Sequence, residues 1–166
     1  MEEHRSLSCV IIGEGTLPIR CAEILLQRGH VIRGVVSPDG SVGRWAEENG
    51  IPAIGSWDAL EFFLSQHPFD YLFSIVNSLV LSRSVLALPQ QCVINYHDGP
   101  LPCYAGSHAT SWALMNREER HGVSWHVASE QVDAGDVLKQ RAFEIAAGET
   151  ALSLNARCYD AALASF

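Results

Sequence analysis

Several signals that mark common protein classes are missing from this sequence of 166 residues. The five cysteines include no Cys-x-x-Cys pair and no regular spacing, which argues against a disulfide framework or a zinc site and favours reduced, intracellular thiols. No apolar run approaches the ~20 residues that a membrane-spanning helix needs. The start, MEEHRSLS, is polar and acidic and therefore unlike a signal peptide. We expect a soluble, cytoplasmic protein with no membrane partner.

Positive charge is also scarce. Lys and Arg number 11 against 19 Asp and Glu, for a net charge of −8. A protein that binds the phosphate backbone of RNA or DNA needs a basic face, so we expect no nucleic-acid partner. With 48% hydrophobic residues, the chain is sufficient for one globular domain spanning 1–166. Its last helical segment runs to Phe166 with no stop signal, so we expect further domains to follow this one in a longer protein.

Three familiar functional motifs are incomplete or absent. Gly13-Glu14-Gly15 follows an apolar run, but Pro18 stands where a dinucleotide fingerprint needs a third Gly or Ala, and a tight strand-to-helix turn is the better interpretation. No Gly-x-Ser-x-Gly nucleophile elbow is present. His121 and His126 are five residues apart on an expected strand, so alternation directs them to opposite faces and they cannot share an ion. We expect no metal site.

Apolar runs alternate with amphipathic segments along the chain, which predicts β-α-β units and an α/β fold with a doubly wound, mostly parallel sheet. The expected strands are 7–12, 31–37, 51–55, 70–76, 92–97, 122–129 and the segment VLKQRAF at 137–143. The expected helices are 18–29, 43–50, about 56–67, 82–89, 107–116 and 149–166. In GVSWHVAS, at 122–129, clean alternation favours an antiparallel or edge-side strand.

The segment INYHDGPLPCYAG, from Ile94 to Gly106, places an amide and an imidazole at a strand end. Asn95 and His97 are two residues apart and therefore point to the same side of the strand. Two such donors suit an oxygen that becomes negative during a reaction. Asp98 would tend to point away from this pair, whereas Asp133, in a loop flanked by Val132 and Gly135, can reach over to it; the loop carboxylates considered are Asp98, Glu130, Asp133 and Asp136. On the residues alone, Asn95 is equally well a turn cap and His97 a satisfied buried histidine.

The pattern Asn-Tyr-His-Asp-Gly-Pro-Leu-Pro-x-Tyr-x-Gly, followed by Val-Asp-Ala-Gly-Asp, resembles the signature of the 10-formyltetrahydrofolate-dependent formyltransferases. The resemblance covers essentially the whole chain and implies a Rossmann-like fold. It matches the family's catalytic Asn and His to Asn95 and His97, and its catalytic Asp to Asp133. It also implies transfer of a formyl group from 10-formyltetrahydrofolate to an amine, through a tetrahedral oxyanion.

The same resemblance implies a role for each residue. Asn95 and His97 would stabilise the oxyanion, while Asp133 would favour the protonated form of His97 and help to receive the amine proton. The reduced folate would lie in an apolar slot. The residues implied for that slot are Ser78, Leu79, Val80, Leu81, Glu130, Gln131 and Val132.

Departures from the family's pattern narrow the acceptor. The short segment after the second strand and the net charge of −8 argue against tRNA, and Glu14 would repel a phosphate. The version found here is most similar to the formyltransferase-like domains at the front of nonribosomal peptide synthetases. An aminoacyl group held by a carrier domain is then the implied acceptor, with another small amine as the broader possibility. A non-catalytic structural or docking module, and hydrolysis of formyltetrahydrofolate, remain as alternatives.

Overall fold

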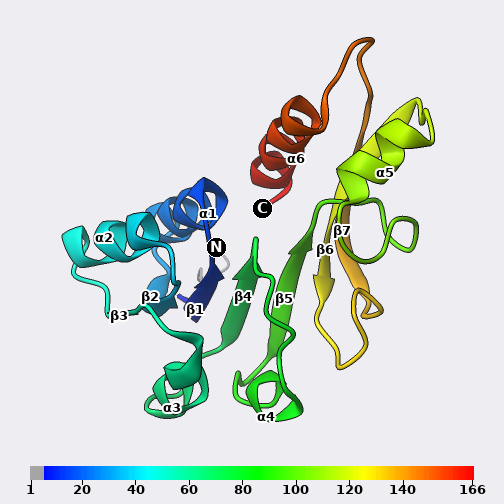
Figure 1. Ribbon diagram of the computed structural model, residues 1–166. Coiled ribbons are helices and arrows are strands. Elements are labelled where there is room, and N and C mark those ends of the chain that lie inside the picture. Colours follow the sequence, from blue (N-terminus) through cyan, green and yellow to red (C-terminus); the bar gives the residue numbers. More distant parts are fainter. Residues whose placement is uncertain (1–5) are drawn as a thin grey trace, which may run out of the picture. The chain divides into compact units, whose positions relative to one another are not determined.

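The computed structural model of this chain describes residues 6–166 (Figure 1). The first five residues, which include His4 and most of the polar start, lie outside the described part. Two compact units make up the chain, one ending at Ile94 and the other beginning at Asn95. The boundary falls inside a single strand, β5 (Cys92–His97).

The first unit is built from β-α-β repeats with parallel strands. The strand order is β3-β2-β1-β4, followed by the first half of β5, and the pairs β1–β2, β1–β4 and β2–β3 are all parallel. Its strands are β1 (Ser8–Gly13), β2 (Val31–Val36), β3 (Ala53–Ile54) and β4 (Tyr71–Ile75). Its helices are α1 (Thr16–Gln27), α2 (Gly40–Glu48), η1 (Trp57–Ala59), α3 (Leu60–Ser65) and α4 (Arg83–Leu86).

Helices cover both faces of these strands. Figure 1 shows α1 and α2 on one side of β1 and β2, and α3 on the other. On the α3 side the Phe63 ring lies so close to Gly34 of β2 that an added Cβ would stand 2.3 Å from it. Burial of β1 is nearly complete, with Val10, Ile11 and Ile12 each at most 2% exposed. Long runs of buried apolar residues are typical of parallel strands covered on both sides.

The second unit combines a hairpin with two helices. Its elements are the end of β5, α5 (Ala109–Met115), β6 (Arg120–Val127), β7 (Val137–Glu144) and α6 (Ala151–Ser165). The strands are neighbours in the order β5-β6-β7, and β6 pairs with β7 in an antiparallel manner. Helix α6 packs on this hairpin through Trp125, whose indole N–H donates to the Ala162 carbonyl and the Ser165 hydroxyl.

The α/β class and the doubly wound, mostly parallel sheet predicted from the sequence are confirmed. The antiparallel character predicted for the segment GVSWHVAS is also confirmed, although its alternation does not appear as alternating burial. All residues from His121 to His126 are buried, so β6 is covered on both faces. Within residues 6–166, every helix is too short or too polar to cross a bilayer.

Candidate active site

Asn95 and His97 occupy the end of β5, the position predicted for them. Asn95 is partly buried, and its side-chain amide donates to the carbonyl of Tyr96 at 3.1 Å. The same amide nitrogen lies 3.1 Å from Nε2 of His126 on β6. Asn95 therefore caps no turn; its amide is turned toward a neighbouring histidine.

His97 is 6% exposed and has different partners at its two ring nitrogens. Nε2 donates to the carbonyl of Tyr104 at 2.7 Å; because a carbonyl can only accept, Nε2 carries a proton. Nδ1 lies 3.4 Å from Oδ2 of Asp133 and 3.9 Å from Oδ1 of Asp98. His97 is thus a buried, hydrogen-bonded histidine, and it also directs its second nitrogen at a carboxylate. The interpretation of His97 as a satisfied buried histidine is confirmed, while its catalytic role stays a prediction.

Asp133 reaches this position because its loop folds tightly against the end of β6. Its φ of 52° lies in the left-handed region, which Asp tolerates better than most residues. Two residues later, an added Cβ on Gly135 would stand 1.8 Å from the Val127 carbonyl, so only glycine allows this approach. A physical reason for the Asp-x-Gly spacing follows: the glycine brings the loop onto β6, and the aspartate then faces the cluster.

The Asp133 carboxylate is surrounded by donors. Oδ2 accepts from the backbone N–H of Gly106 at 2.8 Å, and Oδ1 lies 3.4 Å from His126 Nε2. Burial raises the pKa of Asp133, but the contact with His126, the Gly106 hydrogen bond and the nearby His97 outweigh it. The net effect lowers the pKa of Asp133, which is therefore a carboxylate at neutral pH.

His126 belongs to this cluster, although the sequence did not single it out as a site residue. It is 2% exposed, and its Nδ1 lies 3.0 Å from the Val127 carbonyl, which assigns a proton to Nδ1. Its Nε2 can accept from Asn95 only without a proton, and can donate to Asp133 only with one. One signal was available, since this histidine lies one residue before the end of β6, the last strand before the Asp133 loop. A register shift between Trp125 and His126 hid its direction from simple alternation.

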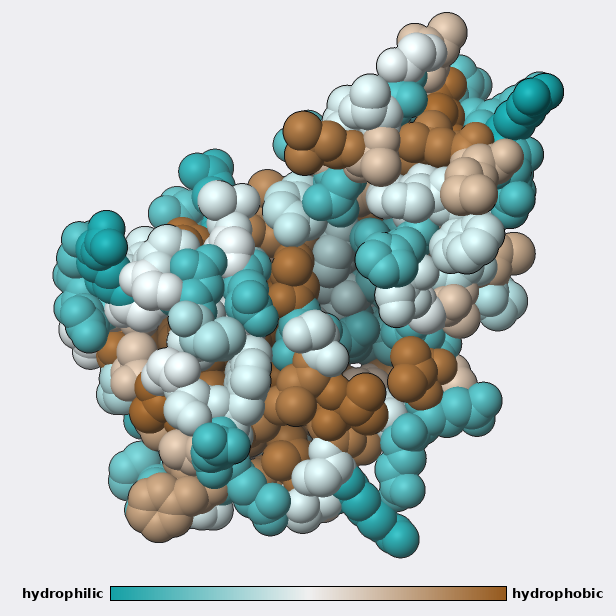
Figure 2. Space-filling model, viewed as in Figure 1, coloured by the Kyte–Doolittle hydropathy of each residue, from teal (hydrophilic) through white to brown (hydrophobic). Residues whose placement is uncertain are grey.

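The other predicted residues lie on two loops, one in each unit. Residues 78–81 connect β4 to α4, where Figure 2 shows hydrophobic residues gathered on the face it draws. Asn77 fixes this turn, because its side chain accepts from the Leu79 N–H and donates to the Leu79 carbonyl. Val80 is 67% exposed, and Val132, in the 130–132 segment of the other unit, is 55% exposed. No group of three metal-binding side chains comes together within the described residues.

Comparison with known proteins gives a consistent result. A family model described as formyl transferase matches residues 59–165. Methionyl-tRNA formyltransferase from Alkaliphilus oremlandii is 26% identical over 168 residues, which cover 91% of this chain and 54% of that protein. The chain therefore spans about half the length of this relative.

Two solved structures illustrate the shared fold. Phosphoribosylglycinamide formyltransferase from Anaplasma phagocytophilum superposes with a TM-score of 0.85 at 21% identity, covering 96% of this chain and 83% of that one. A formyltetrahydrofolate deformylase from Pseudomonas syringae gives 0.84 at 17% identity, covering 97% and 59%. At these identities the likeness establishes the fold alone.

Proposed function

This chain belongs to the formyl transferase family, and from that premise we propose that it transfers the formyl group of 10-formyltetrahydrofolate to an amine. The observation that carries the proposal is the convergence of Asn95, His97 and Asp133. A single carboxylate faces the free nitrogen of His97 on one side and, through His126, the amide of Asn95 on the other. This arrangement offers donors for a developing oxyanion next to a group that accepts a proton.

The proposed reaction needs no other reactant. The amine nitrogen attacks the formyl carbon, and the carbonyl oxygen becomes an oxyanion to which Asn95 donates a hydrogen bond. Asp133 takes the amine proton, directly or through an ordered water, while the neighbouring His97 stabilises the oxyanion. The bond between the formyl carbon and N10 of the folate then breaks, N10 takes up the proton that Asp133 received from the amine, and tetrahydrofolate and the formylated amine leave.

For the folate we propose the two loop segments inferred from the family pattern. They comprise Ser78, Leu79, Val80 and Leu81, together with Glu130, Gln131 and Val132. Val80 and Val132 are both exposed, which leaves each side chain able to contact an apolar ring system. The backbone of residues 78–81 would supply hydrogen bonds to the pterin, which makes side-chain identity there less important.

For the acceptor we propose an amine without a phosphate, and specifically an aminoacyl group on a peptide-synthetase carrier domain. The turn before α1 supports the first part. The N–H of Gly15, at the helix N-terminus, donates to the carboxylate of Asp39 at 2.9 Å. Hydrogen bonds from Ser41 and Gly15 also lower the pKa of Asp39. A negative charge of the chain itself thus stands where an acceptor phosphate would bind, and Pro18 removes a further donor.

The net charge of −8 supports the absence of a nucleic-acid partner. We further propose that the protein acts in the cytoplasm, in one-carbon metabolism linked to peptide synthesis. Hydrolysis of formyltetrahydrofolate is the second candidate, since a deformylase shares the fold. A domain that keeps the cluster but only docks to other domains is the third.

Binding and turnover measurements separate these candidates. Calorimetry with a stable 10-formyl folate analogue should detect binding to the wild type, and His97→Asn should retain it. Release of tetrahydrofolate should require an added amine or aminoacyl carrier, and Asp133→Asn should abolish it. Release of tetrahydrofolate without any amine would favour hydrolysis of formyltetrahydrofolate over formyl transfer as the function. Binding without release under any condition would leave only the docking role.

A further inference from the structure

One buried hydroxyl holds the loop that follows His97. Ser124 on β6 is fully buried; its Oγ donates to the Gly99 carbonyl at 2.8 Å and accepts from the Leu101 N–H at 3.0 Å. A further N–H reaches it from Gln140, at 3.0 Å. A hydroxyl has one proton and two lone pairs, so every hydrogen-bonding position of Ser124 is used. The loop backbone at 99 and 101 is thereby fixed to the strand.

Two more side chains of the hairpin bind the same loop. Gln140 is the partner of Ser124 in the β6–β7 register, and its Nε2 donates to the Leu101 carbonyl at 2.8 Å. His121 Nε2 donates to the Asp98 carbonyl at 2.8 Å. His121 and Ser124 are three residues apart, so they lie on opposite faces of β6 and hold the loop from two sides. We name Ser124, Gln140 and His121 the loop clamp.

The clamped loop lies directly against the ring of His97. A Cβ added to Gly99 would stand 2.8 Å from His97 Nε2 and 3.1 Å from the Tyr104 carbonyl oxygen. The Gly99 backbone therefore packs against the hydrogen bond that places a proton on Nε2. The loop backbone at Gly99 and the imidazole of His97 are therefore in close contact, beside the hydrogen bond to Tyr104.

We propose that Ser124 is a positioning residue for His97, supported by Gln140 and His121. The clamp sets the orientation and tautomer of the imidazole, so that Nε2 donates to Tyr104 and Nδ1 faces the carboxylate. The effect of Ser124 on catalysis rests on the proposed formyl transfer, whereas its effect on the orientation of His97 does not.

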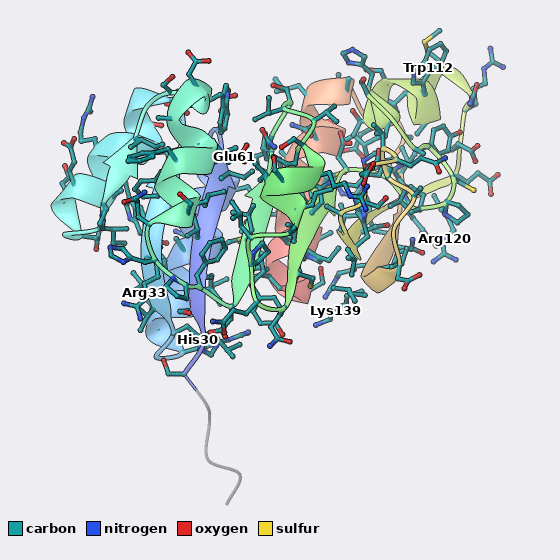
Figure 3. All side chains as sticks on the ribbon, turned by 90° about the horizontal axis from the view of Figure 1, so that it is seen from below. His30, Arg33, Glu61, Trp112, Arg120 and Lys139 are labelled. Carbon is teal, nitrogen blue, oxygen red and sulfur yellow. The ribbon has the colours of Figure 1, made fainter. Side chains whose placement is uncertain are left out.

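Two substitutions and two matched controls test the proposal. Ser124→Ala removes the central hydroxyl, and Gln140→Ala removes one outer contact. Ser165→Ala is the control for Ser124, because its hydroxyl is also buried but donates to the carbonyls of α6. Lys139→Ala is the control for Gln140, since Lys139 is its exposed neighbour on β7 and projects away from the sheet (Figure 3).

The tautomer is read by NMR of protein carrying ¹⁵N-labelled histidine, with the His97→Asn spectrum identifying the His97 signals. We expect the wild type to show the Nε2 proton at His97, and Ser124→Ala to show a mixture of tautomers. The rate constant kcat should fall about 10- to 100-fold, as small misplacements of catalytic groups do, with KM for the folate changed less than about threefold. Gln140→Ala should have the same effects to a smaller degree. Both controls should leave the tautomer and kcat unchanged.

The outcomes are distinguishable. If Ser124→Ala loses stability like Ser165→Ala but keeps the wild-type His97 signals and kcat, the clamp is merely structural and the proposal is wrong. If the His97 signals change but the wild type itself transfers no formyl group, the positioning role is supported and the proposed function fails.

Discussion

At the residue scale, Asp133 does the most to define this site. Its two oxygens face two histidines from different strands, 3.4 Å away in each case. The backbone assigns the other nitrogen of each ring, Nε2 of His97 and Nδ1 of His126, as a donor to a carbonyl. The nitrogens that are left to gain or lose a proton are therefore the two that face the carboxylate. Gain or loss of a proton in the site therefore involves His97, His126 and Asp133.

His126 should be tested first, because the sequence did not point to it. We expect His126→Ala to lower kcat on the order of 10- to 100-fold, the effect of removing one hydrogen bond to a charged group. Folate affinity, measured by calorimetry, should change little, since His126 contacts Asn95 and Asp133 rather than the loops proposed for the folate. His108→Ala is a suitable control, as that histidine is exposed and lies before α5. Wild-type kcat in His126→Ala would remove this residue from the mechanism.

His121 should make stability depend on pH. It is 1% exposed, and its Nδ1 has no hydrogen-bond partner in the described part of the chain. Burial lowers the pKa of His121, against the opposing effects of the Asp98 carbonyl and carboxylate and of Glu118, and His97 lowers it further. The aromatic rings of Tyr104 and Phe143 also pack against it. The folded protein therefore keeps His121 neutral, whereas the unfolded chain protonates it near pH 6.5.

Since the unfolded state binds the extra proton, the free energy of unfolding should be highest above about pH 6.5 and should fall as the pH drops below it. Urea titrations between pH 7.5 and 5 measure this. His121→Gln keeps a donor for Asp98 but cannot titrate, and its pH slope should be smaller. Asp133, whose pKa is lowered, acts in a separate window, because its contribution disappears only at more acidic pH. Equal slopes for wild type and His121→Gln would assign the pH dependence to other groups.

At the scale of elements, α6 packs against β6 through Trp125, the residue that precedes His126. Its first turn carries a capping box. The Thr150 hydroxyl accepts from the Ser153 N–H, and the Ser153 hydroxyl accepts from the Thr150 N–H. Thr150→Ala should therefore lower the free energy of unfolding by about 1 kcal/mol, measured by urea denaturation, with kcat retained. Ser56→Ala, at the short η1 turn, should lower the free energy of unfolding by less than Thr150→Ala does. A loss of activity in Thr150→Ala would mean that the geometry of the catalytic cluster depends on the first turn of α6.

Periodicity predicted most of these elements, and tertiary contacts explain what it missed. The strands 92–97 and 70–76 were placed within a residue of β5 and β4, because short apolar runs between turn residues leave few alternatives. Alternation suggested one covered face for β6, yet neighbours cover both. Asn95 and His97 were paired from their two-residue spacing on one strand, and Asp133 was added from the resemblance to the family signature; their catalytic role stays a prediction. His126 was not expected near them, because nothing in the sequence states that the loop at Gly135 folds back onto Val127.

At the scale of the whole molecule, the two units contribute differently to the proposed function. Asn95, His97, His126 and Asp133 all belong to the unit that begins at Asn95, so the catalytic cluster is assembled within a short stretch of chain. The folate residues proposed at 78–81 belong to the other unit. The family model, matching residues 59–165, includes both sets. The strand spacing pairs Asn95 with His97, whereas Asp133 follows only after α5 and β6 and was assigned from the family resemblance, as were the folate segments.

The distribution of thiols gives a test of the packing of both units. Cys9, Cys21 and Cys158 are at most 1% exposed, whereas Cys103 is exposed. Burial, with a smaller effect of Asp70, raises the pKa of Cys9 to about 12, and burial raises that of Cys158 to about 12 as well. At pH 8 such a thiol is ionised to only on the order of one part in ten thousand, whereas an ordinary thiol is about one-quarter thiolate.

In a reaction with a disulfide reagent at pH 8, one thiol should therefore react quickly, and Cys103→Ser should remove that phase. Cys92, which is partly buried and has a raised pKa, should follow more slowly. The remaining three should react only in denaturant, to a total of five. Because Cys9 and Cys21 report on the first unit and Cys158 on the second, their exposure in increasing urea shows whether the units open together. Rapid reaction of Cys158 in the native protein would contradict the packing of α6 on the hairpin that carries the clamp.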